Sequence, residues 1–239
     1  HIPGARFLDL DEDLAGPVTG QTGRHPLPDV DTITSRLGEI GVGTSSKVVV
    51  YDAANGAMAA RAWWLLQWLG HDDVRLLDGG FAQWQTLGFA TESGDVIPEA
   101  TQFEARVRPE LVLTTEELAA DLEGIQRRNL LDARDTARFR GEREPIDAVA
   151  GHVPGARNVP FADFLNHDGT WKPLDERGRL LEEALGTARD VPWSVMCGSG
   201  VTACHLAISG LEAGFGAPRL YVGSWSEWIR DPERPVGRG

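Results

Sequence analysis

The chain opens with HIPGAR at residues 1–6 and returns to nearly the same stretch, HVPGAR, at residues 152–157. Two more pairs of blocks follow in the same order: VVVYD at 48–52 with WSVMC at 193–197, and LLDGGFAQW at 76–84 with LYVGSWSEW at 220–228. Solenoid repeats recur every ~20–50 residues, and the spacing here is far longer. We therefore predict two copies of one domain, at residues 1–100 and 110–239, joined by a polar, Pro-containing linker around 94–109.

The second copy alternates short apolar strands with helices. Strands are predicted at 129–133, 192–196 and 219–222, and helices from Thr114, over 180–185, over 201–213 and from Trp225. This alternation predicts an α/β fold in which each domain is a mostly parallel sheet flanked by helices. The first copy starts directly at its HIPGAR block, so we expect it to lack its N-terminal strand and helix in this chain.

The composition is typical of a soluble globular protein and excludes several classes of partner. Acidic residues outnumber basic ones by 36 to 23, giving a formal net charge of −13, whereas nucleic acid requires a basic surface. No apolar run approaches the ~20 residues that cross a membrane. Cys197 and Cys204 have no CxxC spacing and the histidines no ligand spacing, so neither a disulfide scaffold nor a metal site is predicted. Two thiols fit a reducing compartment, and we expect a cytoplasmic location.

The sequence CGSGVT at residues 197–202 lies between a predicted strand and a predicted helix. At such a turn the backbone N–H groups point into one concave space, and the helix N-terminus adds partial positive charge. A cysteine placed there is favoured as the thiolate, which is the nucleophilic form. We expect the cradle for a small anion to comprise Gly198, Gly200, Val201 and Thr202. The two glycines are expected to take unusual φ values, and Thr202 to cap the loop.

The first copy has Asp52 where the second has Cys197, so its loop is expected to have no thiol chemistry. We therefore interpret residues 1–100 as a non-catalytic domain that supports the second and forms a wall of its site. Cys204 lies on an apolar helix beside Leu206 and Ala207, and we expect it in the core. Cys197 is thus the candidate nucleophile.

These features together resemble a known family. The tandem repeat, the two HxPGA turns and the CGSGVT loop are similar to the two-domain sulfurtransferases, namely thiosulfate sulfurtransferase (rhodanese) and 3-mercaptopyruvate sulfurtransferase. The resemblance implies two tandem rhodanese-like domains and a ping-pong reaction through a persulfide on Cys197. Its implied partners are a small-molecule donor, 3-mercaptopyruvate or thiosulfate, and a thiol, cyanide or sulfite acceptor, with thioredoxin among the thiols. No cofactor is implied, because the chemistry needs only the thiol.

The resemblance also implies roles for particular residues. Gly198 and Ser199 match the mercaptopyruvate type of loop, and in that group a Ser–His–Asp arrangement is proposed beside the cysteine. Ser199, His25 and Asp11 match its members. Arg138 matches the substrate-binding arginine, whose guanidinium can bind a carboxylate or sulfonate bidentately. Mercaptopyruvate enzymes commonly carry a second arginine about nine residues further on, where this chain has Asp147, so thiosulfate stays open as a donor.

Two other functions are compatible with parts of the pattern. A cysteine phosphatase or arsenate reductase also places a Cys loop at a helix N-terminus, but such loops end in an arginine, and here Thr202 and Ala203 follow. A non-catalytic rhodanese-like binding or sulfur-relay module fits Asp52 in the first copy. The intact loop of the second copy favours the enzyme.

Overall fold

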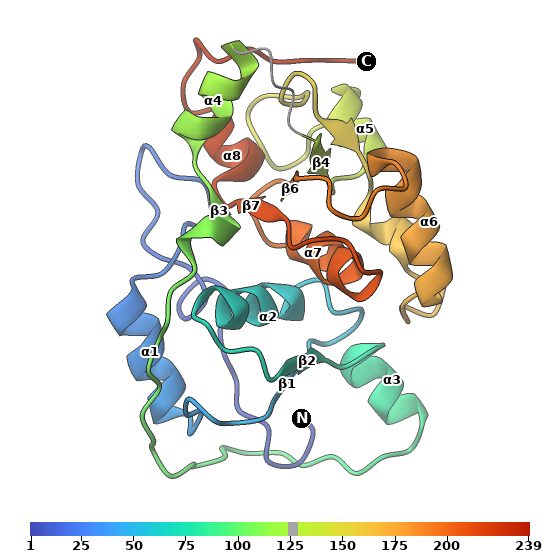
Figure 1. Cartoon of the computed structure of the whole chain (residues 1–239). Helices are drawn as coiled ribbons and strands as arrows, with labels where there is room; N and C mark the ends of the chain where they lie inside the picture. Colours follow the sequence, from blue (N-terminus) through green and yellow to red (C-terminus); the bar gives the residue numbers. More distant parts are fainter. Residues whose placement is uncertain (124–128) are drawn as a thin grey trace.

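A five-stranded parallel sheet forms the centre of the C-terminal domain (Figure 1). This computed structural model describes residues 1–123 and 129–239. The sheet has the strand order β3-β7-β6-β4-β5. Its strands and helices are η1 (Pro109–Leu111), β3 (Val112–Leu113), α4 (Thr115–Glu123), β4 (Asn129–Asp132), α5 (Thr136–Arg140), β5 (Arg157–Asn158), η2 (Phe161–Phe164), α6 (Leu174–Leu185), β6 (Trp193–Met196), α7 (Ala203–Glu212), β7 (Arg219–Tyr221) and α8 (Ser224–Trp228).

Alternate residues of these strands face two separate apolar layers, as the two-residue period of a strand requires. Leu130, Met196 and Tyr221 pack with α4 and α8 on one face. Their neighbours Leu131, Val195 and Leu220 pack on the other face, with α6 and α7. The predicted α/β fold with helices on both faces of a parallel sheet is therefore confirmed.

The N-terminal domain has a smaller sheet, in which β1 pairs in parallel with β2. Its elements are α1 (Val30–Glu39), β1 (Val48–Val50), α2 (Ala59–Trp68), β2 (Val74–Leu76) and α3 (Gly80–Thr86). The repeated turn has the same geometry in both domains, because Ala5 N–H donates to Ile2 O at 3.0 Å and Ala156 N–H donates to Val153 O at 3.0 Å. The internal repeat of the sequence is thus a repeat of structure.

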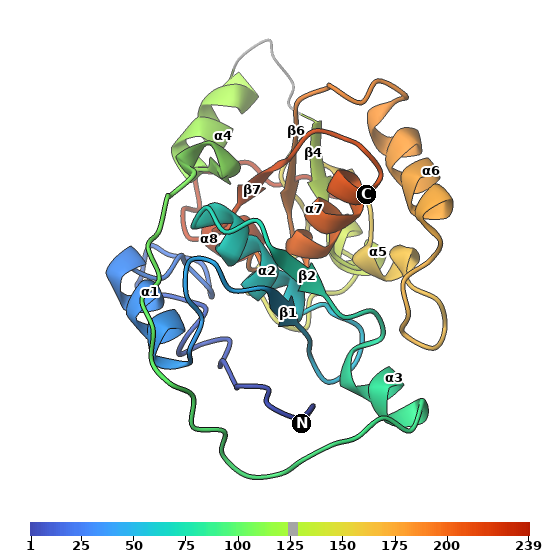
Figure 2. The same cartoon turned by 60° about the horizontal axis from the view of Figure 1, so that its bottom comes forward.

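The two domains meet where α2 lies against α7, and these helices are adjacent in both views (Figures 1 and 2). α2 is buried nearly all round, including Trp63, Trp64 and Trp68, and shares one apolar cluster with α7. Helices that are apolar on every side belong inside a protein. These tryptophans therefore pack in the core and between the domains.

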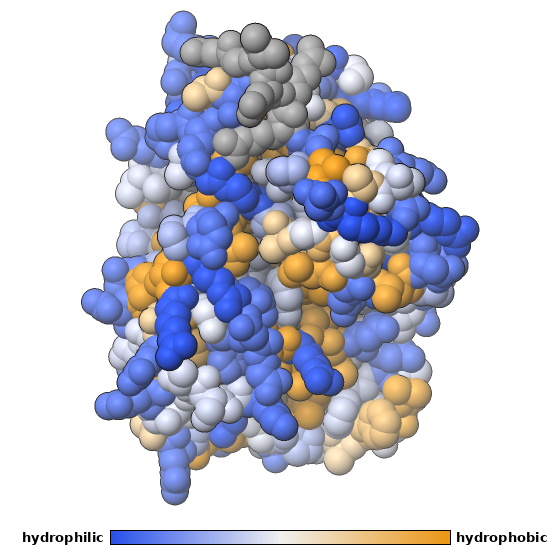
Figure 3. Space-filling view, in the orientation of Figure 1, coloured by the Kyte–Doolittle hydropathy of each residue, from blue (hydrophilic) through white to orange (hydrophobic). Residues whose placement is uncertain are grey.

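The segment between the domains runs along the outside of the N-terminal domain and up to β3 (Figure 1). It is held there by backbone hydrogen bonds, such as those from Thr101 N–H to Gly38 O at 2.9 Å and from Arg106 N–H to Leu69 O at 2.8 Å. The face seen in Figure 3 is mostly hydrophilic, with apolar groups gathered toward its middle and lower right. The contact between α2 and α7 lies in the interior, because nearly all residues of both helices are buried.

Local sequence signals account for the element ends nearest the candidate loop. Thr114 Oγ1 accepts the N–H of Glu117 at 3.2 Å, and Glu117 Oε2 accepts the N–H of Thr114 at 3.0 Å, which forms a capping box at the start of α4. Gly214, with φ +80°, follows the C-terminus of α7, where a left-handed glycine commonly ends a helix. β6 ends at Met196, so Cys197 is the first residue after the strand.

Candidate active site

Cys197 lies at the carboxyl end of β6 and is only 2% exposed. Gly200 N–H donates to its Sγ at 3.2 Å. The carbonyl oxygens of Cys197 and Gly198 accept from the N–H groups of Trp225 (3.0 Å) and Ser226 (2.9 Å), at the start of α8. These bonds turn the loop carbonyls toward α8, which leaves the loop N–H groups to face the other side.

The loop N–H groups form an open cradle. Those of Gly198, Ser199 and Val201 donate to no acceptor among residues 1–123 and 129–239. Gly200 has φ +76°, and a Cβ on it would lie 2.4 Å from Val222 O, so glycine is required there. Unpartnered N–H groups ahead of a helix attract anions.

Two expectations for this loop are wrong in detail. Gly198 does not have a positive φ; instead, a Cβ there would lie 2.8 Å from Nη2 of Arg24, so the glycine admits this side chain. Thr202 occupies the N-cap position of α7 but makes no capping hydrogen bond through its side chain. Its φ and ψ of −68° and −18° are already helical, and a capping side chain needs the extended backbone of a true N-cap.

The corresponding loop of the N-terminal domain is filled by its own carboxylate. Asp52 Oδ1 accepts the N–H groups of Ala54 (3.0 Å) and Gly56 (2.9 Å). Asp52 Oδ2 accepts those of Met58 (2.9 Å) and Ala59 (3.1 Å). The first copy thus has the same cradle, but the carboxylate of Asp52 occupies it and the loop has no thiol.

His25 and Asp11 come together, as predicted, with His25 Nε2 3.0 Å from Asp11 Oδ1. Burial lowers the pKa of His25, and Asp11 partly opposes this, so the imidazole is neutral at pH 7 with its proton on Nε2. Nδ1 is buried and has no hydrogen-bond partner among the described residues. Ser199 is buried, and its hydroxyl makes no hydrogen bond to His25 or to any other described residue. The structure therefore contains the His25–Asp11 pair of the arrangement, without a hydrogen bond between this pair and Ser199.

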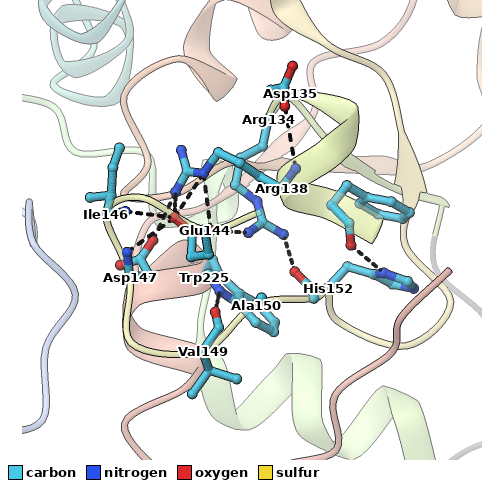
Figure 4. Close-up of polar contacts among 12 residues, drawn as sticks. Arg134, Asp135, Arg138, Glu144, Ile146, Asp147, Val149, Ala150, His152 and Trp225 are labelled. Carbon is cyan, nitrogen blue, oxygen red and sulfur yellow. Dashed lines mark hydrogen bonds and ion pairs between the residues drawn. The ribbon is translucent and has the colours of Figure 1, made fainter. Parts of the chain in front are cut away.

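Arg138 lies on α5 beside a buried network of charges (Figure 4). Its Nε donates to both oxygens of Glu144, at 3.0 and 3.1 Å, and its Nη2 donates to Asp147 Oδ2 at 3.1 Å. Arg134 pairs with Asp132 at 2.7 Å and lies over the ring of Trp225, 4.8 Å from its centroid. Arg138 reaches the loop, since its Nη2 is 3.4 Å from a Cβ built on Gly198.

Comparison with known proteins identifies the family of the chain. The rhodanese-like domain model matches residues 1–87 and 114–231. The chain is 48% identical to a probable 3-mercaptopyruvate sulfurtransferase of Pseudomonas aeruginosa, covering 100% of this chain and 84% of that protein. It is 41% identical to a putative thiosulfate sulfurtransferase of Mycobacterium tuberculosis, covering 100% and 84%. The crystal structure of SseA from Escherichia coli, a 3-mercaptopyruvate sulfotransferase, is 34% identical with a TM-score of 0.81, covering 95% of this chain and 84% of that one.

The chain belongs to the rhodanese family. It is a sulfurtransferase of the tandem type, and the resemblance inferred from the repeat and the CGSGVT loop is confirmed. No helix in the described part of this rhodanese is long and apolar enough to cross a membrane. Residues 1–123 and 129–239 contain no cluster of His, Cys, Asp or Glu suited to a metal ion.

Sequence reasoning missed three residues of this rhodanese site. Arg61 of α2 is fully buried and donates to Gly200 O at 3.3 Å, to Leu14 O at 3.3 Å and to His25 O at 3.2 Å, so it ties the histidine segment to the loop. Ser224 accepts the N–H of Cys197 at 3.1 Å and donates to Tyr221 O at 2.8 Å. Arg24 is the third. Its position next to the candidate residue His25 is the sequence feature that could have pointed to it.

Cys204 is the second buried thiol of the rhodanese, and it is structural. It is 0% exposed, and its Sγ lies 3.4 Å from Gly200 O. Burial raises the pKa of Cys204 to about 12, so this thiol stays protonated at neutral pH. The expectation that Cys204 belongs to the core agrees with this environment.

Proposed function

We propose that the chain moves a sulfur atom from 3-mercaptopyruvate or thiosulfate to a thiol, cyanide or sulfite acceptor through a persulfide on Cys197. One observation carries the proposal: the Cys197 sulfur accepts the Gly200 N–H at 3.2 Å, next to the N–H groups of Gly198, Ser199 and Val201, which have no acceptor in the part of the chain that the structure describes. Such a nest of N–H groups stabilises the terminal anion of a persulfide.

The first half-reaction breaks one bond to the transferred sulfur and forms another. With 3-mercaptopyruvate, the Cys197 thiolate attacks the donor sulfur, the S–C bond breaks, and its electron pair stays on carbon as the enolate of pyruvate. That enolate takes the donor's thiol proton and leaves as pyruvate. With thiosulfate, the S–S bond breaks and its electron pair leaves with sulfite. In both cases Cys197 carries one additional sulfur and one negative charge.

The second half-reaction returns the enzyme to its starting state. An acceptor such as cyanide attacks the outer sulfur, the S–S bond of the persulfide breaks, and its electron pair restores the Cys197 thiolate. Thiocyanate is then the product, and a thiol acceptor, including that of thioredoxin, gives an acceptor persulfide. The two unpaired cysteines support a cytoplasmic setting for these acceptors.

The residues around Cys197 have separate roles in the proposed sulfur transfer. Val201, Thr202 and the two loop glycines line the cradle, and Arg138 binds the donor's anionic end. Ser199 donates its hydroxyl to the oxygen that gains charge when the S–C bond breaks. His25, neutral and oriented by Asp11 at 3.0 Å, offers the Nδ1 lone pair to that hydroxyl. The N-terminal domain, proposed as residues 1–100, is non-catalytic in the sense that Asp52 replaces the nucleophilic cysteine, and residues 110–239 form the catalytic domain.

The test is intact mass after incubation with each donor separately. A gain of about 32 Da, reversed by cyanide, is expected for one sulfur on a cysteine nucleophile. Cys197→Ser should remove the gain, and Cys204→Ser is the matched control that should keep it. A gain that persists in Cys197→Ser would refute the assignment of the nucleophile. No gain in the wild-type chain with either donor would refute this donor class.

A further inference from the structure

A short loop of the N-terminal domain, residues 22–24, is docked on α8 of the catalytic domain through its main chain. Thr22 O accepts from Arg230 Nε at 3.1 Å, and Gly23 N–H donates to Glu227 Oε2 at 3.3 Å. Arg24 N–H donates to Ser226 Oγ at 3.0 Å. Because these bonds involve no side chain of the loop, they hold the Cα of Arg24 in place whatever its side chain does.

The Arg24 side chain extends from this anchor to the residue after the nucleophile. Its Nη2 lies 2.8 Å from the position of a Cβ on Gly198, and Arg138 Nη2 lies 3.4 Å from the same point. Two guanidinium groups from different domains therefore converge beside Cys197. Burial and the Arg138 charge lower the pKa of Arg24, whereas the charge of Cys197 acts in the opposite direction.

One buried carboxylate holds the two guanidinium groups together. Asp147 Oδ1 pairs with Arg24 Nη1, and Asp147 Oδ2 accepts from Arg138 Nη2 at 3.1 Å. The Asp147 side chain is 5% exposed, whereas that of Arg24 is 30% exposed and thus open to a solute. Nε and Nη2 of Arg24 have no hydrogen-bond partner among the described residues. One edge of the planar, fork-shaped Arg24 guanidinium therefore keeps two N–H-bearing nitrogens available for a ligand.

The charges around this fork balance before any donor is bound. Three guanidinium groups, of Arg24, Arg134 and Arg138, face three carboxylates, of Asp132, Glu144 and Asp147. A site with this balance needs no permanent counter-ion. It can bind an oxyanion through the geometry of its N–H groups and release the product anion afterwards.

We propose that Arg24 is a donor-binding residue supplied by the non-catalytic domain, and that its Nε and Nη2 grip the oxyanion group of the sulfur donor beside Gly198. That group is the carboxylate of 3-mercaptopyruvate or the sulfonate of thiosulfate, held so that the donor sulfur meets Cys197. The inference rests on the proposed persulfide function and adds the residue that selects anionic donors. It also adds donor binding to the part that His25 and Asp11 give the N-terminal domain in the proposed reaction.

The test compares Arg24→Met and Arg24→Lys with Arg230→Met, which weakens the docking of the same loop without reaching Gly198. Arg24→Met should raise KM for the donor about tenfold to a hundredfold, as expected for loss of a charge-assisted bidentate contact, and leave the loading rate at saturating donor nearly unchanged. Arg24→Lys should recover part of the loss, because it keeps the charge without the fork. Arg230→Met should change KM less than about threefold, as one exposed hydrogen bond would.

The two donors are measured in parallel arms. If KM rises for 3-mercaptopyruvate alone, the Arg24 guanidinium binds a carboxylate. If KM rises for thiosulfate alone, it binds a sulfonate. If KM rises for both donors, it binds either oxyanion. Wild-type loading with unchanged KM in Arg24→Met would overturn the inference and leave the persulfide function intact. Equal KM changes in Arg24→Met and Arg230→Met would overturn it too, because docking alone would then explain them. A wild-type chain that loads from neither donor would overturn both proposals.

Discussion

The loops after β1 and β6 have similar backbone hydrogen bonding and differ in the side chain that occupies their cradle of N–H groups. Phe81 N–H donates to Asp52 O at 2.9 Å, just as Trp225 N–H donates to Cys197 O at 3.0 Å. In the first loop a carboxylate accepts four N–H groups of its own chain. In the second the cysteine sulfur accepts one, and the N–H groups of Gly198, Ser199 and Val201 have no acceptor among the described residues. The anion cradle is thus a property of the fold, and the residue at the strand end decides whether it is closed or available.

Exchanging the strand-end residues tests that comparison with the largest expected effect. Cys197→Asp removes the nucleophile and lets a carboxylate accept the free loop N–H groups, so loading should fall by about four orders of magnitude or more. The reciprocal exchange, Asp52→Cys in the same chain, should not restore it, because Arg138, Ser199 and the converging guanidinium groups lie at the other loop. Intact mass with each donor measures both. Restored loading in the double variant would show that the cradle alone suffices.

A second difference between the two loops is the residue that contacts the strand end from the following helix: Ser224 in the C-terminal domain and Gly80 in the N-terminal domain. They occupy matching positions, and both have positive φ, +52° and +55°. A Cβ at Gly80 would lie 2.7 Å from Asp52 O, whereas Ser224 fits and its Oγ accepts the Cys197 N–H. Ser224→Ala should lower the loading rate about tenfold, since a buried N–H without a partner costs about 1–3 kcal/mol.

Ser224→Gly separates the hydrogen bond from the backbone strain. It also loses the bond to Cys197 but relieves the positive φ, so it should load as slowly as Ser224→Ala while being about 1 kcal/mol more stable to urea. Single-turnover loading and urea unfolding of both variants provide the comparison. Full activity in the glycine variant would mean that the serine serves only the backbone.

Opening the closed loop should affect stability and leave catalysis unchanged. Asp52→Asn keeps the shape but removes the charge and one acceptor oxygen from four N–H donors at the start of α2. The free energy of unfolding in urea should fall by about 1–3 kcal/mol, with loading per folded molecule unchanged. Asp73→Asn is a matched control, because Asp73 is exposed and its side chain makes no hydrogen bond to the described residues. A lowered loading rate in Asp52→Asn would show that the closed loop takes part in the reaction.

His205, on α7 behind the open loop, should make the protein sensitive to acid. Burial, with the Arg177 charge, lowers the pKa of His205 to about 3, and both ring nitrogens lack partners among the described residues. The unfolded chain takes up this proton below pH ~6.5 and the folded chain only near pH 3. Stability from this group is therefore complete above pH ~6.5 and is lost progressively as the pH falls, by about 2 kcal/mol at pH 5.

His205→Phe should flatten that loss, because the ring packs against Trp171 and Phe161 without needing a hydrogen bond. Urea unfolding at pH 7 and pH 5 measures the change. An unchanged pH dependence in His205→Phe would assign the acid sensitivity to other groups.

Much of this architecture could be predicted from sequence, because three blocks of sequence recur in both domains and each copy supports the interpretation of the other. The nucleophile, its loop and the His25–Asp11 pair followed from local patterns and from the family resemblance. What could not be predicted depends on contacts across the domain boundary. Arg61 and Arg24 are ordinary arginines in sequence, and only the packing of α2 on α7 and of residues 22–24 on α8 brings them to Cys197. Asp147, where an arginine was expected, proved to pair with Arg24.

The buried guanidinium of Arg61 joins the two domains independently of the segment that connects them. It bonds carbonyl oxygens of Leu14, His25 and Pro26 on one side and of Gly200 on the other, deep inside the molecule. The connecting segment, by contrast, is 92% exposed at Ile97. A protease that cuts there would sever the polypeptide but none of the contacts that assemble the site, so the enzyme would persist as a two-chain complex.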